Sequence, residues 1–189
     1  MSNTELVTRP SLPGKKILVT GPSKSGKSRW AESLICSSEP ITYIATGIYD
    51  DQDKDWLEKI RIHQLRRPKA WNLVETSKDL CSYIQTLNGN LLIDSLGGFV
   101  SVHLNKTEVE WRTISLELIT AVKNSRSSIV IVIEQTGWSI VPATRLGLLF
   151  SDRLGELSQQ LDLISDQSWL VLQNRAINIT DLSERVPYL

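Results

Sequence analysis

The sequence is 189 residues long, with 41% hydrophobic and 22% charged residues, a balance typical of globular proteins. Basic and acidic residues number 21 each, so no net charge attracts nucleic acid or an anionic membrane surface. No apolar run is long enough to insert into a membrane, and residues 1–13 lack the apolar stretch of a secretory signal. We therefore expect a cytoplasmic protein that acts on a small molecule.

The N-terminal residues differ in character from the rest of the chain. Residues 1–14 are predicted to be a disordered leader, because the segment 8–14 combines two prolines with a glycine and shows no periodicity. Residues 15–189 are expected to form a single domain. Cys36 and Cys81 have no metal-ligand spacing, so both are expected to be ordinary free thiols.

Short apolar runs alternate with longer amphipathic segments along the chain. Continuous apolar runs are typical of strands that are buried on both faces of a sheet. Trp71–Glu75 is predicted as a further short strand, and Ala176–Thr180 as the second strand of a hairpin. The main strands are predicted at Ile17–Thr20, Ile41–Ala45, Leu91–Asp94, Ile129–Ile133 and Trp169–Leu172.

Helices are predicted between these strands, each of the length that a crossover connection needs. Strand followed by helix, repeated along the chain, predicts an α/β fold of three layers, with a mostly parallel sheet and helices on both faces. The segment after the Leu91–Asp94 strand contains Gly97 and Gly98, which predict a loose loop there. The helices are predicted at Lys27–Ser37, Lys54–Leu65, Lys78–Leu87, Glu108–Lys123 and Thr144–Ile164.

The segment Gly21-Pro22-Ser23-Lys24-Ser25-Gly26-Lys27-Ser28 matches the phosphate-binding pattern GxxxxGK[ST], directly after a predicted strand and at the start of a predicted helix. In this pattern successive backbone N–H groups point at phosphate oxygens, and the helix dipole adds positive potential. Lys27 is predicted to bridge the outer phosphates of ATP or GTP and Ser28 to ligate Mg²⁺. The alternative is a turn that merely links strand to helix.

Asp94 ends another apolar strand, where P-loop enzymes place a second magnesium-positioning group. We therefore predict Ser28 and Asp94 as the Mg²⁺ ligands. A carboxylate that caps the following turn is the alternative. Together these features predict a P-loop NTPase-like fold, with the nucleotide at the carboxyl ends of the strands.

A basic segment follows the second predicted strand. Lys59–Trp71 resembles the basic-Ile-x-x-His-x-x-x-Arg-Pro-x-x-Trp signature of the bifunctional adenosylcobinamide kinase and adenosylcobinamide-phosphate guanylyltransferase family of cobalamin biosynthesis. Tyr43–Gly47 and Gly137–Pro142 resemble two further segments of that family in order and spacing, and Glu75 follows Trp71 at the family's distance.

The resemblance implies a two-step chemistry. ATP or GTP phosphorylates a hydroxyl of adenosylcobinamide, and GTP then transfers GMP to that phosphate through a guanylylated histidine, which corresponds to His63. A neutral imidazole has the free lone pair that this role needs, and nearby arginines can hold phosphate. The alternative is a surface histidine on a basic helix. The resemblance also implies a homotrimer, and it places Ala45, Thr46, Gly47, Gln64, Leu65, Arg66, Arg67, Glu75 and Asp94 around the guanine nucleotide.

The chain departs from the family pattern at several positions. Gln135 replaces an expected carboxylate, and Ser151 and Ser158 replace an arginine and an asparagine. These departures leave two alternatives open: an enzyme with kinase activity alone or on another alcohol, and a nucleotide-binding protein without catalysis. Trp138 borders the expected corrinoid site, where an exposed indole could stack on a flat ligand or pack in a protein contact.

Overall fold

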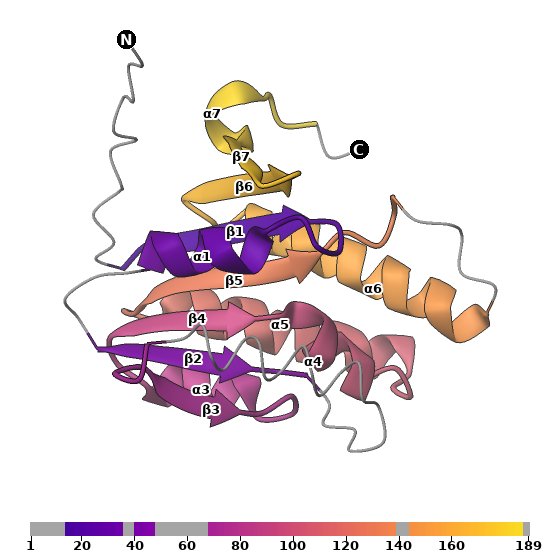
Figure 1. Cartoon of the computed structure of the whole chain (residues 1–189). Coiled ribbons are helices and arrows are strands. Elements are labelled where there is room, and N and C mark those ends of the chain that lie inside the picture. Colours follow the sequence, from indigo (N-terminus) through magenta and orange to yellow (C-terminus); the bar gives the residue numbers. More distant parts are fainter. Residues whose placement is uncertain (1–13, 36–39, 48–67, 139–143, 187–189) are drawn as a thin grey trace, which may run out of the picture.

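The computed structural model describes residues 14–35, 40–47, 68–138 and 144–186. Its described strands form one sheet of seven strands in the order β3-β2-β4-β5-β1-β6-β7, parallel except for the β6–β7 hairpin (Figure 1). The predicted α/β fold with a mostly parallel sheet is therefore confirmed. The strands are β1 (Lys16–Gly21), β2 (Ile41–Ala45), β3 (Asn72–Glu75), β4 (Asn90–Asp94), β5 (Ser128–Glu134), β6 (Gln167–Leu172) and β7 (Arg175–Asn178).

Helices connect these strands. None of those described is both long and apolar enough to span a membrane. The longest, α5 and α6, are preceded by Thr107 and Thr144, whose side chains accept hydrogen bonds from the N–H groups of Glu110 and Gly147 and so cap the helices. The described helices are α1 (Lys27–Ile35), α3 (Leu80–Thr86), α4 (Leu96–Val102), α5 (Glu108–Asn124), α6 (Arg145–Asp162) and α7 (Ile179–Leu182).

All seven predicted strands are confirmed, as are the four predicted helices within the described residues, with ends shifted by a few residues. The helix predicted at Lys54–Leu65 lies outside the described residues. The loose loop predicted at Gly97 and Gly98 is wrong, because both glycines lie in α4. A Cβ at Gly98 would come within 1.9 Å of the Thr46 carbonyl oxygen, so the glycines serve close packing rather than flexibility.

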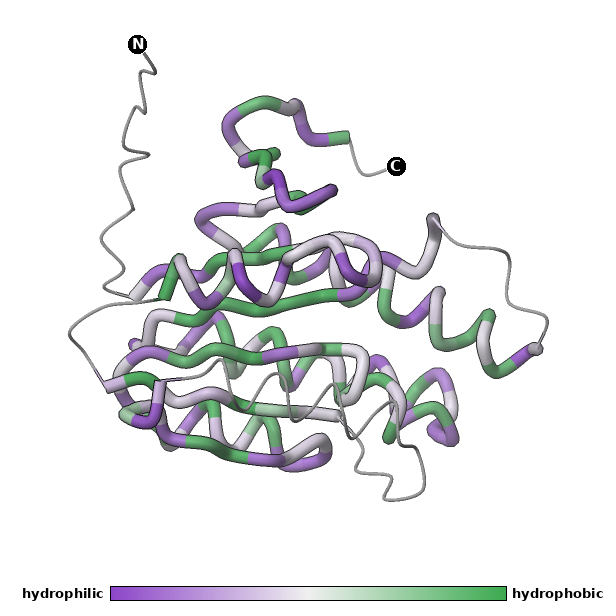
Figure 2. The backbone as a smooth tube through the Cα atoms, in the orientation of Figure 1, coloured by the Kyte–Doolittle hydropathy of each residue, from purple (hydrophilic) through white to green (hydrophobic). Residues whose placement is uncertain are grey.

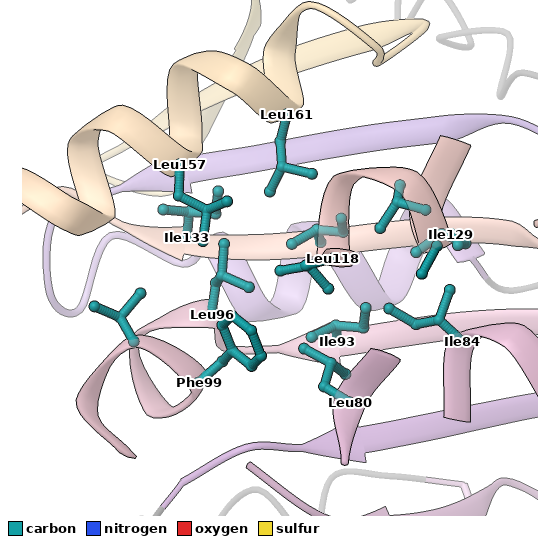
Figure 3. Close-up of a cluster of buried hydrophobic side chains, with 14 of the residues drawn as sticks. Leu80, Ile84, Ile93, Leu96, Phe99, Leu118, Ile129, Ile133, Leu157 and Leu161 are labelled. Atoms are coloured by element: carbon teal, nitrogen blue, oxygen red, sulfur yellow. The ribbon is translucent and has the colours of Figure 1, made fainter. Parts of the chain in front are cut away.

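Two apolar clusters cover the two faces of the sheet. On one face Ala31, Leu34 and Ile35 of α1 pack against Val130 and Val132 of β5. On the other face α3, α4, α5 and α6 bring together the side chains that Figure 3 shows, among them Phe99 and Leu118. The alternation of strand residues between the two clusters explains why the central strands are largely apolar between their ends, as their colour in Figure 2 indicates.

Arg153 of α6 is buried, with 3% of its surface exposed, and links α6 to the connection between α4 and α5. Its guanidinium donates hydrogen bonds to the carbonyl oxygens of His103 at 2.8 Å and Lys106 at 2.7 Å. The same group lies 5.1 Å from the centre of the Trp111 ring, within the range of a cation–π contact. Arg153 therefore ties α6 to the α4–α5 connection and to α5.

Cys81 is half-buried in α3. Burial and, secondarily, the nearby Glu117 carboxylate raise the pKa of its thiol to about 11. The thiol is therefore protonated at neutral pH, which agrees with the unreactive role expected for it.

We expect Arg153→Met to lower the free energy of unfolding by about 2 kcal/mol, because two partly buried carbonyl groups lose their donors. Arg112→Met is the matched control, since the Arg112 side chain is 78% exposed and its ion pair with Glu108 contributes little. Urea unfolding followed by circular dichroism measures both. Equal stability of the two variants would contradict the role given to Arg153.

Candidate nucleotide site

The loop between β1 and α1 contains the predicted phosphate-binding segment. β1 runs from Lys16 to Gly21 and α1 begins at Lys27, so the loop has the strand and helix that the motif requires. Lys24 and Gly26 adopt positive φ angles of 59° and 98°, which turn the loop back on itself. The Lys27 ammonium donates to the Pro22 carbonyl oxygen at 3.1 Å, so the lysine reaches over the loop.

The β6–β7 turn supports this loop from the side. Asn174 donates its backbone N–H to the Ser25 carbonyl oxygen at 2.9 Å, and its side-chain oxygen accepts from Arg29. A Cβ at Gly26 would lie 2.7 Å from that side-chain oxygen, and one at Gly21 would lie 2.3 Å from the Val171 carbonyl oxygen. Both glycines are therefore needed for the close approach of the hairpin, besides any contact with phosphate.

Asp94, Ala45 and Glu75 lie in one row at the carboxyl edge of the sheet. Ala45 of β2 is the register partner of both Asp94 of β4 and Glu75 of β3. The Tyr43 hydroxyl donates to a carboxylate oxygen of Asp94 at 2.9 Å, which orients the carboxylate. The structure thus brings together three of the residues predicted around the nucleotide, at the edge where the phosphate loop also lies (Figure 1).

Thr46 and Gly47, also predicted at the nucleotide, directly follow β2. Thr46 is fully buried: its hydroxyl donates to the Ser95 carbonyl oxygen, and its own carbonyl accepts from the Ser77 hydroxyl at 2.9 Å. The Thr46 side chain therefore joins the ends of β2 and β4 inside the protein. Gly47 and Glu75 are exposed at the same edge.

Glu134, at the end of β5, was not among the predicted site residues. Its carboxylate accepts hydrogen bonds from the Ser95 hydroxyl and from the Gly97 N–H, the latter at 3.1 Å. The signal was present in the sequence, because β5 is an apolar strand that ends in an acid, as the strand of Asp94 is. The family pattern has its carboxylate one position later, where this chain has Gln135.

His63 and its neighbours Gln64, Leu65, Arg66 and Arg67 lie outside the described residues. Their predicted roles stay predictions. Trp138, by contrast, is described and is 58% exposed.

The residues around the loop fit the binding of Mg²⁺ together with a nucleotide. The described residues contain no group of three or more His, Cys, Asp or Glu that could hold a metal ion alone. Mg²⁺ in nucleotide sites commonly takes only one or two protein oxygens, with phosphates and waters completing the octahedron. The Ser28 hydroxyl and the Asp94 carboxylate are oxygen donors of this kind, at the start of α1 and the end of β4.

A sequence profile of the family described as "Cobinamide kinase / cobinamide phosphate guanyltransferase" matches residues 17–179. The chain belongs to this family. It is 34% identical over 181 residues to the bifunctional adenosylcobalamin biosynthesis protein CobU of Escherichia coli K12, covering 86% of this chain and 98% of that protein. The CobU protein of Salmonella typhimurium LT2 is 31% identical over 188 residues, with the same coverage.

Solved structures with little sequence identity support the fold alone. A structure from Pyrococcus horikoshii OT3 has a TM-score of 0.54 at 9% identity and covers 89% of this chain and 87% of its own. An ATPase from the type III secretion system of pathogenic bacteria has a TM-score of 0.51 at 12% identity, covering 90% of this chain and 53% of its own. Both agree with an α/β fold of the P-loop NTPase type.

We expect Lys27→Ala to weaken binding of ATP with Mg²⁺ roughly 10- to 100-fold, since one charge-assisted contact to phosphate is lost. Lys123→Ala removes the same charge from the last turn of α5, far along the chain from the loop, and is the control. Isothermal titration calorimetry measures both affinities. Unchanged affinity in Lys27→Ala would exclude the loop as the phosphate site.

Proposed function

We propose that the protein phosphorylates adenosylcobinamide with ATP or GTP and then transfers GMP from GTP to the new phosphate, giving adenosylcobinamide-GDP. The observation that carries the proposal is the pairing of the formed phosphate loop with membership of a family named for both activities. The names of the two CobU relatives, which describe bifunctional proteins of adenosylcobalamin biosynthesis, support it further.

In the phosphoryl step the loop holds the nucleotide. The backbone N–H groups of residues 23–28, which include the first turn of α1, receive the phosphates, and Lys27 neutralises charge on the outer ones. Ser28 and Asp94 would hold Mg²⁺, which supplies further neutralisation of the phosphate oxygens. The Tyr43 hydroxyl donates to a carboxylate oxygen of Asp94 at 2.9 Å and so holds this carboxylate in place at the end of β4.

In the guanylyl step His63 is the nucleophile. Its imidazole forms a bond to the α-phosphorus of GTP and pyrophosphate leaves, and the GMP then passes to the phosphate of adenosylcobinamide phosphate. We propose Gln64, Leu65, Arg66 and Arg67 as contacts of the guanine nucleotide, together with Ala45, Thr46, Gly47, Glu75 and Asp94. The exposed carboxylate of Glu75, in register with Ala45, supports a base contact at this edge.

Two alternative functions include only part of this two-step reaction or none of it. An enzyme that retains the kinase step alone is favoured by Gln135 and Ser158, which depart from the family pattern. A nucleotide-binding protein without catalysis would need only the loop. The match spans 98% of each of the two CobU relatives, which favours the bifunctional enzyme over both alternatives.

Mass spectrometry after incubation with adenosylcobinamide, Mg²⁺ and GTP should detect first the phosphate and then adenosylcobinamide-GDP. GTP labelled at the α-phosphate should leave an acid-labile, base-stable label on the protein, which His63→Ala abolishes because the nucleophile is gone. His63→Ala should still form the phosphate. Phosphate as the final product of the wild type would support the kinase-only enzyme, and no product at all would support the non-catalytic one.

We also propose that residues 15–189 form a single domain that works in the cytoplasm as a homotrimer. Exposed apolar side chains support a subunit contact: Trp138 precedes the segment 139–143, and Leu146 and Leu148 follow it, with exposures of 58%, 57% and 41%. Light scattering coupled to size-exclusion chromatography should give three times the mass of 21.3 kDa. A monomer at micromolar concentration would contradict the trimer.

A further inference from the structure

Glu134 lies on the strand that separates the phosphate loop from Asp94. It is the register partner of Gly21, the first residue of the loop, on β1. Two residues earlier on β5, Val132 is the register partner of Asp94 on β4. Neighbouring strands lie about 4.8 Å apart, so the backbone of Glu134 is one strand from the loop and one strand from the strand of Asp94.

Strand alternation places the two acids on the same face of the sheet. Leu92 and Val132, each two residues before an acid, both pack in the cluster beneath α1. Side chains two residues apart share a face. By this alternation Asp94 and Glu134 start from the face on which α1 lies, and at the edge of the sheet the Glu134 carboxylate reaches the first turn of α4.

The Glu134 carboxylate is held in a fixed position and keeps acceptor capacity. One oxygen accepts from the Ser95 hydroxyl and the other from the Gly97 N–H. Each carboxylate oxygen has two lone pairs, so each retains one. The residue is only half-buried, and among the described residues no Lys, Arg or His lies within ion-pair distance of it.

The lack of a side chain at Gly97 leaves room for this carboxylate. A Cβ at position 97 would lie 2.9 and 3.0 Å from the two Glu134 oxygens, closer than real Cβ contacts. A side chain at position 97 would therefore push the carboxylate away. The absence of a side chain lets the carboxylate lie against the first turn of α4.

We propose that Glu134 is the proton acceptor of the phosphoryl step, an inference that rests on the proposed function. A Glu134 oxygen takes the proton of the substrate hydroxyl while the hydroxyl oxygen forms a bond to the γ-phosphorus. The bond from that phosphorus to the β–γ bridging oxygen breaks, and ADP or GDP leaves. The proton then passes from Glu134 to water, which restores the carboxylate. Gln135 is an amide and cannot take this role.

Glu134→Gln keeps the shape and the acceptor oxygen but removes the base. We expect its kcat for phosphorylation of adenosylcobinamide to fall about 10²- to 10⁴-fold, with the KM for nucleotide within threefold of the wild type. Glu156→Gln, an exposed glutamate on α6, is the control and should behave as the wild type.

Measuring the guanylyl step distinguishes a role of Glu134 as a base from a merely structural role. Glu134→Gln should still label His63 with GTP and convert supplied adenosylcobinamide phosphate at the wild-type rate. Gly97→Ala, which displaces the carboxylate without changing its chemistry, should show the same selective loss of the phosphoryl step.

Three results would overturn the proposal. The first is a kcat of Glu134→Gln within threefold of the wild type. The second is a parallel loss of both steps with a lower free energy of unfolding, which would mean that Glu134 only caps α4. The third is a wild-type protein that does not phosphorylate adenosylcobinamide, in which case the proposed function itself fails and this inference fails with it.

Discussion

The backward turn of the chain between β1 and α1 is the feature on which the site depends. A loop that points consecutive N–H groups at one place would cost free energy unless neighbouring structure held it there. Here β1 lies between β5 and β6 in the centre of the sheet, and the β6–β7 turn holds the loop through Asn174. The loop is thus formed by the fold before any nucleotide arrives, which lowers the entropy that binding must offset.

The order of the strands decides which side chains meet this loop. β5 lies between β1 and β4, so Glu134 and Asp94 approach the loop from successive strands on one side. On the other side of Asp94 lie Ala45 and Glu75, in the same row. A phosphate group held by the loop would therefore lie one strand from Glu134 and two strands from Asp94.

The sequence predicted the strands well because buried parallel strands are continuously apolar, a pattern that few other elements share. It could not predict the strand order, since pairing across the sheet leaves no local trace. It also missed α4, because glycine has a poor helix propensity. In the fold, the close contacts of Gly97 with Glu134 and of Gly98 with Thr46 outweigh that propensity. The phosphate loop was predictable because its motif combines spacing with context. Glu134 ends an apolar strand, as Asp94 does, but its contacts with Ser95 and Gly97 could not be read from the sequence. The role of His63 stays a prediction from resemblance.

The most direct test of the phosphate loop is a crystal structure of the protein with Mg²⁺ and a non-hydrolysable ATP analogue. The account predicts that the β- and γ-phosphates lie within hydrogen-bond distance of the backbone N–H groups of residues 23–28. It also predicts that Mg²⁺ lies between Ser28 and Asp94. A bound analogue whose phosphates lie elsewhere, with the Gly21–Ser28 loop empty, would contradict it.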